Sequence, residues 1–341
     1  MKKKEMITYS GEELMQMELP PVRFVVKDFL SQGLNILAGQ AKVGKSWMML
    51  DLCIKVAKGE KFFGFDTEKS TVLYLCLEDS PNRIRDRMVK LTDTAPANLH
   101  FAVMADNLAG DLTKQIESFI DKHPDTSLVV IDTLQKIRKA KGDMYAGDYK
   151  VISILKRLAE RRGISIVCVH HTRKKSDKDP FNTVSGSTGI TGAADNIYVM
   201  KTDDSCSDFA KLYMRGRDIP ERVLTIQFDN FRWNCLGKSS LENDGFMNDG
   251  AMLSLLSYLK REEIFEGTAS DLCNTLGLKI ESNVLSRKLG KYENELQKAG
   301  VEFTREKKNH TRILTLVYSR SEPGDDGDDI FLHTVNTPKS A

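Results

Sequence analysis

Short apolar runs alternate with amphipathic segments from residue 34 to about residue 200. The apolar runs, each the length of a buried strand, span residues 34–38, 71–77, 99–103, 127–131 and 164–169. The segments between them, at 45–58, 81–92, 111–122 and 148–162, have helical periodicity. Uninterrupted apolar strands separated by helices are typical of a parallel sheet covered on both faces. The pattern therefore predicts an α/β fold with a mostly parallel sheet.

The pattern changes towards the carboxyl end. Three more strands are predicted at 194–200, 209–214 and 222–228, the last two forming an antiparallel edge hairpin. Three helices (251–261, 268–276, 282–299) and two strands (301–306, 311–318) follow, in the order of a winged helix, with Thr268 and Asp271 as a predicted helix cap. The predicted divisions are an arm at 1–19, a core at 20–235, a Gly/Ser/Asn-rich linker at 236–250, a small domain at 251–318 and a disordered acidic tail at 319–341.

Composition and charge narrow the class of protein only slightly. The 341 residues are 40% hydrophobic and 29% charged, with a formal net charge of +2, as in an ordinary globular protein. No stretch approaches the roughly 18 to 20 apolar residues of a membrane span, and the basic start lacks the apolar run of a secretory signal. The six cysteines lie far apart, and Cys53, Cys76 and Cys168 fall inside apolar patterns. We therefore expect a reduced, cytoplasmic protein without a disulfide framework or cysteine metal site.

The full P-loop pattern stands between a predicted strand and a predicted helix, as Gly39-Gln40-Ala41-Lys42-Val43-Gly44-Lys45-Ser46. Its glycines let backbone amides turn towards phosphate oxygens, and the helix N-terminus adds partial positive charge. Lys45 is expected to reach the β- and γ-phosphates, and Ser46 to ligate Mg²⁺. Trp47 completes the predicted nucleotide site. The predicted cofactors are ATP and Mg²⁺, although no motif that reads the base separates ATP from other nucleotides.

Two acids follow apolar strands where a P-loop enzyme needs them. Asp132 ends the run 127–131 and is the predicted second metal ligand, with a helix cap as the alternative. Glu78 follows the run 71–77 and is the predicted base that orients water, with a solvated loop acid as the alternative. Asp79 is expected to serve the next turn instead, where Ser80-Pro81 has the form of a helix start.

Two histidines, His170 and His171, close the strand at 164–169. Adjacent strand residues face opposite ways, so one histidine at most is expected to point at the nucleotide. We favour His171 as a donor to the γ-phosphate; the alternative is a structural role.

With these motifs in order, residues 20–235 resemble the RecA-like ATPases of the RepA type, the hexameric replicative helicases of plasmids and related mobile elements. The matching points are the P-loop, Leu77-Glu78-Asp79, Val130-Ile131-Asp132-Thr133-Leu134, Val169-His170-His171, and Gly186-Ser187 followed by Ala193-Ala194-Asp195-Asn196. The resemblance implies a RecA-like core in which Glu78 is catalytic, Asp132 holds magnesium and His171 contacts phosphate. It also implies a ring, expected to be a hexamer, with ATP bound between subunits.

A ring of this kind needs a positive group from the neighbouring subunit at the transferring phosphate. Arg215-Gly216-Arg217, in the predicted hairpin turn, resembles the Lys-x-Arg finger pair of DnaB-like proteins. Arg217 is the first choice for this role and Arg215 the second. Surface arginines are also common in hairpin turns.

DNA is the predicted macromolecular partner. Two loops match those that face the channel of RecA-like rings, and both are basic: Lys136, Arg138, Lys139 and Lys141 in one, and Arg173, Lys174, Lys175 and Lys178 in the other. Only Tyr145 and Phe181 offer rings there for base stacking, and a solvated charged loop is the alternative.

The predicted winged helix is also basic. Its helix carries Arg287, Lys288 and Lys291 on the side expected to be exposed, and its wing carries Arg305, Lys307, Lys308, Asn309, His310 and Arg312. This suits a duplex backbone, although winged helices also dock proteins.

The sequence thus predicts an ATP-hydrolysing RecA-like motor on DNA, with a helicase of a mobile element as the favoured use. A non-translocating ATP switch that binds DNA or a partner protein is the runner-up. A structural role with a vestigial ATPase is disfavoured, because the P-loop and both acids are intact.

Overall fold

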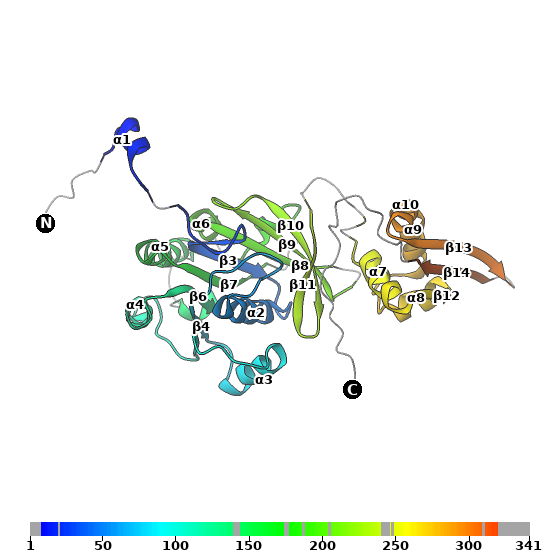
Figure 1. The fold of residues 1–341 in the computed structure, drawn as a ribbon, viewed down its shortest axis with the longest axis horizontal. Helices are drawn as coiled ribbons and strands as arrows, with labels where there is room; N and C mark the ends of the chain where they lie inside the picture. The colour runs from blue at the N-terminus through cyan, green and yellow to red at the C-terminus, as the bar shows by residue number, and fades with distance from the viewer. Residues whose placement is uncertain are drawn as a thin grey trace.

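A large twisted sheet forms the centre of the molecule (Figure 1). The computed structural model describes residues 8–19, 21–138, 144–173, 177–185, 188–203, 206–239, 246, 249–308 and 311–319. Within these residues the sheet has the strand order β11-β10-β9-β8-β3-β7-β6-β4-β5. The strands from β8 to β5 in this order are parallel, namely β3 (Gly33–Gly39), β4 (Thr71–Cys76), β5 (Leu99–Ala102), β6 (Thr126–Asp132), β7 (Ser165–His171) and β8 (Asn196–Thr202).

Alternate side chains of the parallel strands fill two apolar cores, one on each face. Leu37, Val130 and Val167 belong to the core that α2 (Lys45–Lys58) and α3 (Pro81–Leu91) cover. Their neighbours along the same strands belong to the core that α4 (Leu112–Lys122) and α5 (Met144–Arg162) cover. The uninterrupted apolar runs arise because both faces are buried. The predicted α/β class with a mostly parallel sheet is confirmed.

The antiparallel part of the sheet differs from the prediction. Strands β9 (Phe209–Gly216) and β10 (Arg222–Asp229) pair as expected, but β11 (Arg232–Ser239) continues the sheet, so the hairpin is not its edge. The first four residues of the predicted linker, 236–239, belong to β11. Pairing with β10 outweighs their Gly/Ser-rich composition, and Leu236 packs beside the buried Phe209.

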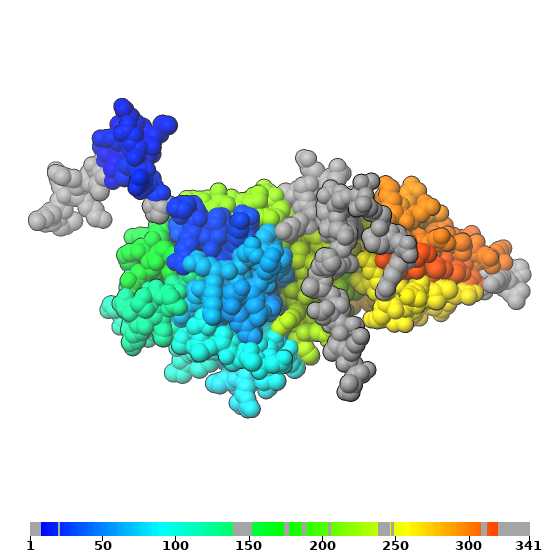
Figure 2. Space-filling view, in the orientation of Figure 1, coloured from blue at the N-terminus to red at the C-terminus, as the bar shows by residue number. Residues whose placement is uncertain are grey.

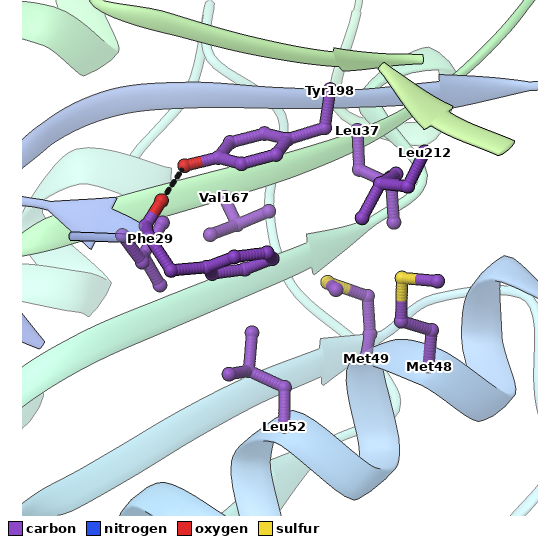
Figure 3. Close-up of a pocket in the computed structure, with 9 residues that line it drawn as sticks. Phe29, Leu37, Met48, Met49, Leu52, Val167, Tyr198 and Leu212 are labelled. Atoms are coloured by element: carbon purple, nitrogen blue, oxygen red, sulfur yellow. Dashed lines mark hydrogen bonds between the residues drawn. The ribbon is translucent and has the colours of Figure 1, made fainter. Parts of the chain in front are cut away.

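A strap of two short strands, β1 (Phe24–Val26) and β2 (Leu30–Ser31), closes one side of the first core. Phe29 inserts from this strap towards α2, and the buried Tyr198 hydroxyl donates a hydrogen bond to the Phe29 carbonyl (Figure 3). The cavity between them holds about 10 Å³ and is lined by apolar side chains. A volume this small, without polar partners, suits no ligand.

Asp195 joins three elements at the end of the sheet where β3 begins. Its carboxylate accepts hydrogen bonds from the Lys156 ammonium of α5 at 2.5 Å and from the Leu34 amide of β3 at 2.9 Å. The Asp195 and Lys156 side chains are only 10% and 17% exposed. Lys156 also donates to the carbonyl of Ala193, the last residue of α6 (Thr188–Ala193). The ion pair therefore fastens α5 and α6 to the sheet.

Replacing Lys156 with methionine is expected to lower the free energy of unfolding by about 3 kcal/mol, because Asp195 would keep a buried charge without this partner. Arg161→Met is the matched control on the same helix, since its ion pair with Glu117 is exposed and should contribute less than about 1 kcal/mol. Chemical denaturation of both variants measures the difference. Equal losses would contradict the assignment of Asp195 as the fastening point.

The described residues from 246 onward build a third apolar core of their own. The elements are α7 (Gly250–Glu262), β12 (Ile264–Gly267), α8 (Ala269–Thr275), α9 (Ser282–Lys291), α10 (Glu293–Lys298), β13 (Val301–Lys308) and β14 (Thr311–Tyr318). The three strands form a separate sheet in the order β12-β14-β13. The capping box of Thr268 and Asp271 at the start of α8 is confirmed. This C-terminal unit lies beside the antiparallel end of the large sheet (Figure 1).

Two features of this unit were not predicted. The expected single helix at 282–299 is interrupted at Tyr292, whose ring is buried against Phe246. Strand β12 is only four residues long and buries Phe265 alone, so its sequence carries little alternation.

Asp203, after β8, accepts a hydrogen bond from the Gly250 amide at 3.1 Å and connects the unit to the large sheet.

The amino-terminal arm contains a short helix, α1 (Gly11–Gln16), which Ser10 and Glu13 cap reciprocally. Figure 2 shows it projecting from the body of the molecule, and Leu14, Met15 and Leu19 are exposed there. Among the described residues, no helix combines the length and the apolar character that crossing a membrane requires. The predicted acidic tail lies outside the described residues, apart from Ser319.

Candidate functional site

The P-loop joins the carboxyl end of β3 to the first turn of α2 in the way its glycines require. Gly44 has a φ of 88°, and a Cβ there would lie 2.8 Å from the Trp233 indole nitrogen. A Cβ on Gly39 would lie 2.9 Å from the Met200 carbonyl oxygen. Larger residues are excluded at both positions, so the loop can follow its tight path. The free amides at the start of α2 can then bind an anion.

Lys45 is nearly buried beneath this loop. Its Nζ donates to the Gly39 carbonyl at 2.9 Å and to the Gln40 carbonyl at 2.6 Å. Burial lowers the pKa of Lys45 to about 8, and the negative charges of Asp132 and Glu78 oppose that shift. The ammonium therefore lies among the groups that would surround a phosphate.

Asp132 ends β6 directly beside Ser46. The Ser46 hydroxyl donates to Asp132 Oδ2 at 2.7 Å, and the Tyr74 hydroxyl donates to the same oxygen at 3.0 Å. Burial raises the pKa of Asp132, while these two hydrogen bonds lower it. A hydroxyl and a carboxylate are the hard oxygen ligands that Mg²⁺ prefers, so the donor set fits this metal. Since no three His, Cys, Asp or Glu side chains gather as a metal site in the described residues, phosphate oxygens and water would have to supply further ligands.

Glu78 follows β4 and reaches the end of β6. Its Oε1 accepts a hydrogen bond from the Thr133 hydroxyl at 3.1 Å, and the Leu77 amide donates to the Asp132 carbonyl at 2.9 Å. Glu78 and Asp132 thus lie at neighbouring strand ends, where open α/β sheets form their sites.

The adjacent acid, Asp79, has a different set of partners. It pairs with Arg83 at 3.0 Å and with Arg87 at 2.5 Å, both on α3. The predicted helix start is confirmed, because Ser80 caps α3 and Pro81 is its first residue. Asp79 is therefore engaged by α3, and Glu78 stays the candidate base at this strand end.

The two histidines face opposite sides of β7, as predicted. His170 is 3% exposed, and its Nε2 is 2.8 Å from the Ser185 carbonyl, which holds the end of the following loop. Desolvation lowers the pKa of His170, which favours the neutral ring. His171 follows the alternation of Val167 and Val169 and so lies on the α2 face. Its Nδ1 is buried and has no hydrogen-bond partner among the described residues.

Trp47 lies in an aromatic group at the start of α2. Its ring is 5.3 Å from the ring of Phe231 in the β10–β11 turn, and the Arg87 guanidinium lies 5.4 Å from the Trp47 centroid. The Trp233 indole donates to the Gly44 carbonyl at 3.3 Å. The β10–β11 hairpin therefore supports the P-loop and the start of α2, a contact that the sequence did not reveal.

Arg215 and Arg217 lie at the other end of the sheet. Gly216 pairs with Asn196, which pairs with Asn35 at the beginning of β3, whereas the P-loop follows the end of that strand. The four residues of β3 from Asn35 to Gly39 separate the two places by about 13 Å. Neither arginine can therefore serve the P-loop of its own chain.

The two arginines differ in how firmly they are held. Arg215 is bound to Glu221 and Asp179 and covers the Phe181 ring at 4.1 Å. Arg217 is 64% exposed, with its Nε 3.8 Å from Asp195. The more loosely held Arg217 is the better placed of the two to reach another molecule.

The predicted DNA-facing loops are described only in part. Lys139, Lys141, Lys174, Lys175, Gly186 and Ser187 lie outside the described residues, as does the side chain of Tyr145. Phe181 is buried beneath Arg215 and is not available for base stacking, because the short helix Pro180–Thr183 turns it into the core.

The prediction was wrong for one residue of the recognition helix. Lys288 is not on the exposed side; it pairs with Asp249 at 2.8 Å, because Asp249 caps the adjacent helix α7. Arg287 and Lys291 are exposed as expected. Of the wing, Asn309 and His310 lie outside the described residues, as does the side chain of Lys308.

Two site residues were missed by sequence reasoning, Tyr74 and Thr133. Tyr74 shares its strand face with Cys76, which lies beside Asp132 in register. That alternation could have indicated Tyr74 once the pairing of β4 with β6 was assumed.

Comparisons with known proteins agree with this geometry. Residues 6–177, just over half of the chain, match a family model described as an AAA domain. The fold is similar to a solved structure described as an ATPase domain, with a TM-score of 0.51 and 15% identity over 60% of this chain and 84% of that one. It is also similar to a DnaB-like replicative helicase whose structure describes its interactions with primase, with a TM-score of 0.50 and 15% identity over 59% of this chain. The chain covers just over half, 57%, of that helicase. No curated protein matches it in sequence. The large sheet and its helices thus have the fold of a RecA-like P-loop ATPase domain.

Proposed function

The chain belongs to the AAA domain family, and from that premise we propose that it is a magnesium-dependent ATPase that drives movement on DNA. The observation that carries this proposal is the arrangement at the P-loop. Lys45, Ser46 and Asp132 are held together beneath it, and Glu78 lies at the next strand end. These residues supply the positive charge, the metal ligands and the base that phosphoryl transfer to water requires.

In this mechanism the γ-phosphate of ATP binds against the amides of the P-loop and the start of α2. Lys45 turns from the Gly39 and Gln40 carbonyls to the phosphate oxygens. Ser46 and Asp132 would hold Mg²⁺, which would neutralise phosphate charge. Glu78 orients a water molecule for in-line attack and accepts its proton, while Thr133 holds the Glu78 carboxylate. His171 donates from the α2 face to the γ-phosphate.

We propose that the active form is a ring of subunits. The resemblance to the RepA type favours a hexamer. The position of Arg217 supports this, because the residue is exposed and too far from its own P-loop to act there. A neighbouring subunit that presents Arg217 to the γ-phosphate would complete the site. The likeness in fold to the solved ATPase domain and to the DnaB-like replicative helicase supports a helicase. The resemblance to the RepA type favours a mobile element as its context.

The DNA partner is supported by basic residues at two places. Arg138 and Arg173 follow the catalytic strand ends, where a central channel would pass single-stranded DNA. The C-terminal unit has the helix and strand order of a winged helix, and we propose that it binds a duplex backbone. Lys307 and Arg312 lie opposite each other on the two strands of the wing. Arg305 donates a hydrogen bond to the Ser286 carbonyl of α9 at 3.4 Å. We propose the ATPase core at 20–239 and the winged helix at 250–318 as the two working parts.

The runner-up is an ATP switch that binds DNA without moving along it. Strand separation distinguishes the two, measured on a forked duplex with wild type and Glu78→Gln. A motor separates the strands with ATP and loses this activity in the variant, whereas a switch shows equal, negligible separation with both. Binding of both proteins to the fork in ATP is the control, because it shows that any loss is not a loss of DNA binding.

A further inference from the structure

Among the described residues, Tyr74 carries the one buried phenol that contacts Asp132, a predicted metal ligand. It lies in the middle of β4 and is 2% exposed. Its hydroxyl donates to Asp132 Oδ2 at 3.0 Å, the same oxygen that accepts from Ser46 at 2.7 Å. The Asp132 carboxylate is thus held by two hydroxyl donors from different elements, one from β4 and one from α2.

A buried tyrosine hydroxyl needs a partner, and most acceptors would satisfy that need. Tyr198 shows the ordinary solution in the same apolar core, because its hydroxyl donates to the Phe29 carbonyl of the strap (Figure 3). Tyr74 instead donates to a carboxylate that is itself 6% exposed and must stay oriented towards Ser46. Its ring is fixed by packing 6.0 Å from that of Phe101. The hydroxyl position is therefore set by the core and imposed on Asp132.

We propose that Tyr74 is a positioning residue that fixes the Asp132 carboxylate against Ser46 and so sets the strength with which nucleotide binds in the presence of Mg²⁺. The inference rests on the proposed function, since it concerns the same site. Without the phenol, Asp132 loses one of its two donors, and its carboxylate can rotate away from Ser46. Residues that orient a metal ligand typically contribute about 10- to 100-fold to metal affinity.

The test compares Tyr74→Phe with Tyr198→Phe, because each removes one buried hydroxyl from the same core. Calorimetry measures the Kd for ADP in Mg²⁺ and again in excess EDTA. We expect Tyr74→Phe to weaken binding in Mg²⁺ about 10-fold and to leave binding in EDTA unchanged. Tyr198→Phe should change neither value. Thermal unfolding of both variants checks that each is folded.

The outcomes separate this inference from the proposed function. The wild type is expected to bind ADP more tightly in Mg²⁺ than in EDTA. If the Tyr74→Phe variant keeps this full difference, the role of Tyr74 alone is overturned. Equal weakening in both conditions would also overturn it, because it would show a purely structural role. Wild type that binds ADP equally in Mg²⁺ and EDTA would overturn the magnesium site and the Tyr74 role together.

Discussion

Glu78→Gln is expected to lower kcat for ATP hydrolysis by about 10²- to 10⁴-fold and to leave the Kd for ATP nearly unchanged. Glutamine keeps the size of the side chain and can still meet the Thr133 hydroxyl, but its amide cannot accept a proton from water. The substituted atoms make no hydrogen bond described above to the residues that would hold the phosphates and the metal, which are Lys45, Ser46 and Asp132. Steady-state hydrolysis and equilibrium binding of ATP measure the two quantities separately.

Asp79→Asn is the matched control for this experiment. It removes a carboxylate from the adjacent position, where the acid pairs with Arg83 and Arg87 of α3 and not with the predicted reaction centre. We expect a much smaller loss of kcat from Asp79→Asn than from Glu78→Gln. The reverse order would show that the base has been assigned to the wrong acid.

Arg217→Ala is expected to lower kcat by about 10²- to 10³-fold, the range seen when one group that stabilises transition-state charge is removed. The structure adds a condition, because Arg217 lies at the end of the sheet away from its own P-loop and can act only on a neighbour. Mixing the inactive variants Arg217→Ala and Lys45→Ala tests this condition. An Arg217→Ala subunit keeps its P-loop and can receive Arg217 from an adjacent Lys45→Ala subunit, so mixed assemblies should regain part of the activity.

Arg215→Ala serves as the comparison for Arg217. Arg215 is engaged by Glu221 and Asp179 and packs on Phe181, so its removal should affect stability more than hydrolysis. A mixture no more active than its separate components would contradict the action of Arg217 across an interface. Full activity of Arg217→Ala alone would contradict any catalytic role for it.

The parallel part of the fold could be predicted because its strands are buried on both faces. Runs such as 127–131 carry a continuous apolar signal, and the P-loop fixes the position of β3 and α2. Asp132 and Glu78 could be placed at one edge of the sheet because carboxyl ends of parallel strands gather there. Strand alternation predicted that His170 and His171 face opposite sides of the sheet.

The remaining features depend on contacts between residues distant in sequence. Strand β11 is stabilised by pairing with β10, and its Gly and Ser residues gave no local strand signal. The break between α9 and α10 lies at Tyr292, whose ring packs on Phe246, 46 residues earlier in the chain. Lys288 looked like a DNA contact because its partner Asp249, which caps another helix, is 39 residues away in the chain. The Tyr74 hydroxyl could not be connected to Asp132 before the neighbours of β4 were known.

We propose that single-stranded DNA stimulates the hydrolysis of ATP at this P-loop. The most direct test of this proposal is the steady-state rate of ATP hydrolysis by the wild-type protein in Mg²⁺, measured with and without single-stranded DNA. We expect a rate that rises strongly with DNA and returns to the basal value when the DNA is digested. A basal rate that single-stranded DNA leaves unchanged would contradict the motor.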